Sequence, residues 1–108
     1  MKTANLPENR KLRPWIVVGG HRPIYSSANG YSKDGLPING PHPPSNCLTL
    51  QKRFEAIFLK YKVDLIFNGH VHSYERNYPA YDNKRTSGFV NPKSPMNIVV
   101  GNAGKSDS

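Results

Sequence analysis

Two short apolar runs, each leading into glycine and then histidine, constrain this chain more than any other feature. The run at 15–18 leads into a glycine pair and His21, and the run at 63–67 leads into glycine and His70, with His72 two positions further on. Runs of this length and composition are typical of buried strands, and alternate residues of an extended backbone point the same way. Neutral imidazole is the commonest protein metal ligand. The pattern therefore predicts two strand ends that form two walls of one metal site.

The size and composition indicate at most one small domain. The chain has 108 residues, of which 36% are hydrophobic, with 10 prolines and 9 glycines. This is poor in apolar residues and rich in turn formers compared with a typical globular domain. We interpret residues 1–14 as a polar lead-in and residues 15–108 as part of a larger domain.

One helix and a third strand complete the expected elements. Apolar residues recur at helical spacing between Leu50 and Tyr61, and a further apolar run follows at 97–100. The residues assigned to the apolar face are Leu50, Phe54, Ile57, Phe58 and Tyr61, and those assigned mainly to the polar side are Gln51, Lys52, Arg53, Glu55 and Lys60. Long loops are expected at 22–46 and 77–96, the second with a short hairpin. This rhythm predicts an α/β (α+β) fold with about three strands and one clear helix, too few elements to cover both faces of a sheet.

The charge balance leaves the class of partner open. Lys and Arg outnumber Asp and Glu by 15 to 7, a net charge of +8, which favours anionic partners. The basic residues are scattered and no nucleic-acid motif is present, so a solvated basic face is the preferred interpretation and specific nucleic-acid binding the last alternative. No signal peptide is visible and no apolar run approaches the ~20 residues that span a bilayer, so we expect no membrane partner.

Two eight-residue segments carry a resemblance to a known family. Residues 20–27 (Gly-His-Arg-Pro-Ile-Tyr-Ser-Ser) and 69–76 (Gly-His-Val-His-Ser-Tyr-Glu-Arg) resemble the last two metal-binding motifs of the purple acid phosphatases. These enzymes belong to the metallophosphoesterase (calcineurin-like) superfamily. The Tyr-Glu-Arg end of the second motif and Pro14-Trp15 before the first strand also match, and the likeness covers about residues 10 to 104.

The resemblance implies a partial metallophosphoesterase β-sandwich flanked by helices, with a dinuclear metal centre. In that family a ferric ion is paired with Zn²⁺, Mn²⁺ or Fe²⁺, and phosphate monoesters are hydrolysed by attack of a metal-bound hydroxide. Carried over by motif, His21 and His70 would bind the divalent ion and His72 the ferric ion. The residues implied to shape the histidine loops rather than to react are Gly20, Gly69, Tyr74, Glu75 and Arg76. No residue is assigned as catalytic with certainty, and the leaving-group acid stays open.

The departures from the family pattern indicate an incomplete site. The motifs G-D-x-G, G-D-x-x-Y and G-N-H-E, which supply the family's aspartates, tyrosine and asparagine ligands, are absent from the chain. We therefore expect the carboxyl-terminal part of an acid phosphatase, inactive alone and needing the missing amino-terminal part of the domain. The alternative is a stand-alone, vestigial metal-binding module without catalysis. The resemblance suggests a secreted or vacuolar/lysosomal protein, although no signal peptide supports this.

Overall fold

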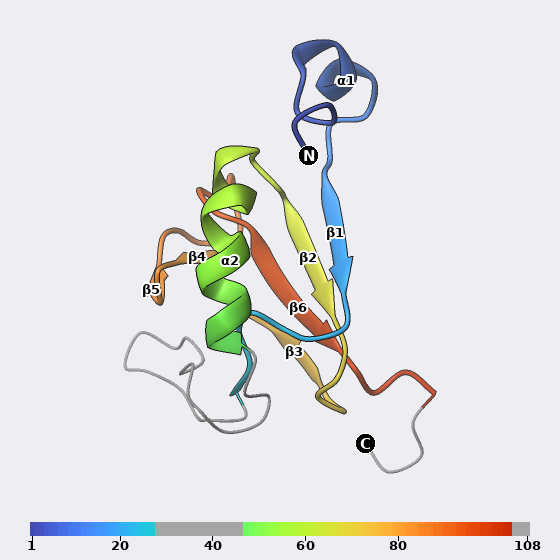
Figure 1. Cartoon of the computed structure of the whole chain (residues 1–108), viewed down its shortest axis with the longest axis vertical. Coiled ribbons are helices and arrows are strands. Elements are labelled where there is room, and N and C mark those ends of the chain that lie inside the picture. Colours follow the sequence, from blue (N-terminus) through green and yellow to red (C-terminus); the bar gives the residue numbers. More distant parts are fainter. Residues whose placement is uncertain (28–46, 105–108) are drawn as a thin grey trace.

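A computed structural model describes residues 1–27 and 47–104 of the chain, without the side chains of residues 47 and 48. Most of the predicted 22–46 loop therefore lies outside the described residues. Figure 1 shows the elements in chain order. They are α1 (Pro7–Leu12), β1 (Val17–Gly20), α2 (Cys47–Lys60), β2 (Leu65–Asn68), β3 (Tyr74–Arg76), β4 (Ala80–Tyr81), β5 (Lys84–Arg85) and β6 (Met96–Val100).

The three predicted strands lie side by side in one sheet. The strand order is β1-β2-β6-β3, with β1, β2 and β6 parallel and β3 antiparallel to β6. Gly20 pairs with Asn68, so β1 and β2 end at the same level. The mixed α/β class is confirmed, and the short hairpin expected within 77–96 is β4–β5. The sequence interpretation missed β3 and α1.

β1 differs from its prediction in position and in burial. We expected a strand over 15–18 that is buried on both faces, whereas β1 begins at Val17 and extends through the two glycines. Trp15 and Val17 are 73% and 53% exposed. The prediction of two-sided burial is wrong because Val17 lies in a row with Leu65 and Met96 on a partly covered face of the sheet, and because β1 has no neighbour beyond it among the described residues.

Helix α2 covers one face of the sheet, but it presents a different side from the one predicted. Phe58 is buried with Ile66 in the core, as expected, whereas Phe54 and Ile57 are 40% and 39% exposed. The polar residues Gln51 and Glu55 are buried instead.

The buried polar side of α2 meets Tyr25, a residue from the loop that follows β1, and the turn at 82–83, where Asp82 N–H donates to Glu55 and Asn83 Oδ1 accepts from Gln51 Nε2 (3.1 Å). The Tyr25 hydroxyl donates to Glu55 Oε2 (2.9 Å) and accepts from Gln51 Nε2 (3.2 Å). Burial, followed by the Glu55 charge, raises the pKa of Tyr25 above its ordinary value, so the phenol stays a donor. A buried polar cluster thus replaces part of the apolar contact that periodicity predicts.

The opposite face of the sheet is apolar and only partly covered. Residues paired across neighbouring strands share a face, and Val17, Leu65 and Met96 form one such row. Phe67 and Ile98 pair in the next row of the same face. All five side chains keep some solvent exposure, in contrast to Ile66 and Val99 on the helix-covered face.

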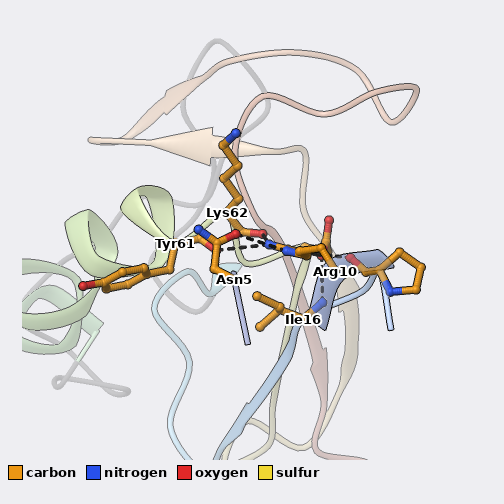
Figure 2. A network of polar contacts seen from close by, with 7 residues as sticks. Asn5, Arg10, Ile16, Tyr61 and Lys62 are labelled. Atoms are coloured by element: carbon orange, nitrogen blue, oxygen red, sulfur yellow. Dashed lines mark hydrogen bonds and ion pairs between the residues drawn. The ribbon is translucent and has the colours of Figure 1, made fainter. Parts of the chain in front are cut away.

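Arg10 ties α1 to the start of the sheet (Figure 2). Its guanidinium donates to Asp64 Oδ2 (2.9 Å) and to the backbone carbonyls of Tyr61 and Lys62 beyond the end of α2. The same Asp64 oxygen accepts the backbone N–H of Ile16 (2.8 Å). One carboxylate therefore fixes the chain ahead of β1 and the chain ahead of β2.

We expect Asp64→Ala to lower the free energy of unfolding by about 1–2 kcal/mol. The substitution leaves the Ile16 N–H without its acceptor and removes one acceptor of the Arg10 guanidinium, which keeps the Tyr61 and Lys62 carbonyls. Both side chains of the ion pair are also partly exposed, which limits the loss. Urea denaturation followed by circular dichroism measures the change. Glu8→Gln, which removes an exposed carboxylate from α1, is the charge-matched control and should change stability by less than about 0.5 kcal/mol. Equal effects of both substitutions would contradict the role of Asp64.

Candidate metal centre

Two histidines meet where β1 and β2 end. His21 directly follows β1, and His70 lies two residues after β2. His21 Nε2 is 3.1 Å from His70 Nδ1, and the two rings meet edge to face, with centroids 5.1 Å apart. The parallel pairing of Gly20 with Asn68 places both turns at one edge of the sheet. The sequence prediction that His21 and His70 lie together at two strand ends agrees with this geometry.

Two hydrogen bonds, one between backbone groups and one from a side chain, hold the two histidine turns against each other. The Gly69 N–H donates to the His21 carbonyl (2.9 Å), and Asn68 Nδ2 donates to the Gly20 carbonyl (3.0 Å). Asn68 is buried, and a Cβ at Gly20 would lie 3.3 Å from its amide nitrogen. Sequence reasoning placed Gly20 and Gly69 in these turns but missed Asn68. Its position at the end of β2, directly before glycine and histidine, was the available signal.

The environment of His70 favours a neutral imidazole. Partial desolvation, followed by the charges of Arg22, His21 and His72, lowers the pKa of His70 below its ordinary value. The neutral ring is the form that binds metal ions. His70 also has a backbone φ of 66°, a left-handed conformation that histidine adopts more readily than most residues.

In the part of the chain that the structure describes, His72 makes no hydrogen bond or ring contact with this pair. It lies exposed in the turn between β2 and β3. Within residues 1–27 and 47–104, no group of three or more His, Cys, Asp or Glu side chains is arranged to hold an ion. The structure thus brings together two of the three predicted ligands.

The three residues after the histidine turn form β3 and have separate contacts. Glu75 is buried, and its carboxylate accepts the backbone N–H of Ser27 (3.0 Å to each oxygen) and the Ser27 hydroxyl. Arg76 lies over the Phe89 ring, 4.7 Å from its centroid, and Tyr74 is 62% exposed. Of these three, Glu75 is the residue that connects the two histidine segments, because its partner Ser27 belongs to the segment that contains His21.

The His21–His70 pair fits a metal ion by its donor types and spacing. Imidazole nitrogens lie 2.0–2.1 Å from Zn²⁺, so two of them on one tetrahedral ion are about 3.3 Å apart. The measured separation of 3.1 Å suits either one shared ion or a hydrogen bond between two neutral rings. Two ligands do not complete a site, so any further ligands come from outside the pair.

In the described part of the chain, no helix has the length and apolar character needed to cross a membrane.

Comparison with known proteins identifies the family of this chain. The profile of the calcineurin-like phosphoesterase family matches residues 2–74. Acid phosphatase type 7 of Danio rerio is 40% identical over 116 residues, which cover 96% of this chain and 25% of that protein. Purple acid phosphatase 1 of Ipomoea batatas is 32% identical over 105 residues, covering 92% of this chain and 20% of that protein.

A solved structure gives the same result for the fold. The purple acid phosphatase PPD1 from yellow lupin (Lupinus luteus) seeds superposes with a TM-score of 0.58 at 30% identity, over 94% of this chain and 17% of that chain. The expected partial metallophosphoesterase fold is thereby confirmed. The chain spans a quarter or less of the length of these relatives. By sequence and by fold, it belongs to the calcineurin-like phosphoesterase family, among relatives that are acid and purple acid phosphatases.

Proposed function

We propose that this chain supplies part of the metal centre of an acid phosphatase that hydrolyses phosphate monoesters. The observation that carries the proposal is the His21–His70 pair, whose ring nitrogens lie 3.1 Å apart at the ends of two adjacent parallel strands. Ligand sites of open parallel sheets lie at this edge. In this proposal residues 15–108 are the carboxyl-terminal part of the phosphatase domain, and residues 1–14 lead into it.

His21 and His70 are proposed to bind one divalent ion, Zn²⁺, Mn²⁺ or Fe²⁺, and His72 a neighbouring ferric ion. Such ions supply Lewis acidity toward a phosphoryl oxygen and lower the pKa of water. The residues of this chain orient the ligands: the Gly69–His21 and Asn68–Gly20 hydrogen bonds fix the two turns, and the Glu75–Ser27 contacts hold the segment after His21. The exposed Arg22, whose charge acts on His70, adds positive potential for a phosphate group.

Catalysis by this proposal needs the amino-terminal part of a metallophosphoesterase domain. Two features support the requirement: among the described residues β1 has no neighbouring strand on its outer side, and the apolar face that includes Phe67 and Ile98 is partly exposed. Parallel sheets are normally covered on both faces. The added segments would also bring carboxylates, which hold two cations together. Alone, the chain is proposed to be inactive.

The alternative is a stand-alone metal-binding module without turnover. The observation that favours it is the lack of any cluster of three potential ligands in the described residues. A module of this kind would bind one ion weakly through His21 and His70 and would not hydrolyse esters.

Grafting distinguishes these two functions. The 108-residue chain and a chimera, in which it replaces the aligned segment of the zebrafish acid phosphatase type 7, are loaded with Zn²⁺ and Fe³⁺ and assayed with an aryl phosphate. We expect no turnover by the chain alone and chelator-sensitive turnover by the chimera. A folded chimera without turnover would favour the non-catalytic module. Chelator-sensitive turnover by the chain alone would contradict the need for the amino-terminal part.

A further inference from the structure

Gly101, the residue after β6, lies directly against the turn that carries His70 and His72. A Cβ built at Gly101 would lie 1.9 Å from the Val71 carbonyl oxygen, 2.7 Å from the Val71 carbonyl carbon and 3.3 Å from the carbonyl carbon of Gly69. All three atoms are backbone, so no side-chain rotation relieves the overlap. Only glycine fits at this position while the turn keeps its place.

The turn itself is tight and has little freedom to move away. Its backbone is closed by hydrogen bonds from Val71 N–H to the Gly69 carbonyl and from Ser73 N–H to the Val71 carbonyl, both 2.8 Å. The Gly101 N–H donates to the Ser73 carbonyl (3.1 Å), so the same residue contacts the turn at two points. A displacement of this turn would move His70 directly.

We infer that Gly101 is a positioning residue, which sets the place of the two-histidine turn so that His70 meets His21. The functional role of Gly101 rests on the proposed metal centre, but the close approach of Gly101 to Val71 does not depend on a bound ion. The sequence pattern assigned no role to Gly101. Gly20 and Gly69 precede the histidines at the ends of β1 and β2. Gly101 is a third glycine at the corresponding end of β6.

Gly19 provides a matched control within the same sheet. A Cβ at Gly19 would meet nothing within 4 Å, and its φ lies outside the left-handed region. Gly104 is unsuitable because its φ is +71°. Gly101→Ala and Gly19→Ala therefore add the same methyl group, with and without an overlap.

The test uses one measurement without metal and one with Co²⁺ on the 108-residue chain. Without metal, we expect the nuclear Overhauser effect between the His21 and His70 rings in the parent and in Gly19→Ala, and its loss in Gly101→Ala. With Co²⁺, titration followed by visible absorption should give about 10-fold or more weaker binding, with a changed spectrum, for Gly101→Ala alone. Unchanged ring contact and Co²⁺ spectrum in Gly101→Ala would overturn the inference.

A second variant covers the case in which Gly101→Ala does not fold. Val71→Gly in the Gly101→Ala background frees the obstructing peptide group to rotate, so we expect the double variant to regain its circular dichroism spectrum and part of the ring contact. A double variant as impaired as Gly101→Ala would overturn the inference. A parent chain that shows the ring contact without binding Co²⁺ would contradict only the proposed metal centre.

Discussion

Replacing either His21 or His70 with alanine is expected to lower the affinity of the chain for Co²⁺ by about 100-fold or more. The two ring nitrogens lie 3.1 Å apart, so each supplies half of the ligands that this chain is proposed to give to one ion. Loss of a residue that merely orients a ligand already costs 10–100-fold in metal affinity, and loss of the ligand should cost at least the upper end of that range. Isothermal titration calorimetry of the 108-residue chain measures the effect.

His72→Ala is the matched control for this prediction. His72 belongs to the same turn as His70 but lies outside the pair, and it is exposed. We therefore expect its substitution to change the Co²⁺ affinity by no more than about threefold, since the proposed ion of His72 lacks its other ligands here. Equal losses at His70 and His72 would contradict the division of the histidines between two ions and would indicate one shared ion.

The meeting of His21 and His70 could be predicted from the sequence because it follows from strand order alone. Two apolar runs that end in glycine and histidine become parallel neighbours, and their carboxyl ends then coincide. The separation of His72 could not be predicted in this way. Alternation in an extended backbone predicts that His70 and His72 point alike, but His70 has a φ of 66°, which breaks the alternation.

The burial of α2 shows why periodicity did not predict the core. The pattern located the helix correctly, and Phe58 is buried as expected. The neighbours of Phe58 on the helix, Gln51 and Glu55, are buried and hydrogen-bond to the hydroxyl of Tyr25. Tyr25 lies 30 residues before Glu55 in the chain. Such a contact depends on the tertiary path of the Tyr25 loop, about which a local pattern holds no information.

β3 was missed for a related reason. Its three residues have no apolar alternation, and their burial pattern of exposed, buried, exposed comes from a buried carboxylate, Glu75. The oxygens of that carboxylate accept hydrogen bonds from Ser27, a residue 48 positions away. The family motif nevertheless pointed to Glu75 as a residue that shapes the histidine loops, a role that now leads to a measurable prediction.

Glu75→Ala is expected to lower the free energy of unfolding by about 3 kcal/mol, roughly a 150-fold change in the ratio of folded to unfolded chain. Glu75 is 7% exposed, and its carboxylate accepts both the backbone N–H and the hydroxyl of Ser27. Its removal leaves both donors without an acceptor in a partly buried place, and hydrogen bonds to a charged group are among the stronger ones. Urea denaturation of the chain measures this loss.

The same substitution should also weaken Co²⁺ binding, by about 10-fold, because Ser27 anchors the segment that begins at His21. Glu75→Gln keeps one acceptor oxygen and should have an intermediate effect on both measurements. Tyr74→Thr changes the neighbouring, 62% exposed residue of β3 while keeping a strand-favouring side chain, and should alter stability by less than about 0.5 kcal/mol. If Glu75→Ala destabilises the fold but leaves Co²⁺ affinity unchanged, then Glu75 stabilises the sheet without placing His21. In that case the Gly69–His21 and Asn68–Gly20 hydrogen bonds between the two turns would be sufficient to place it.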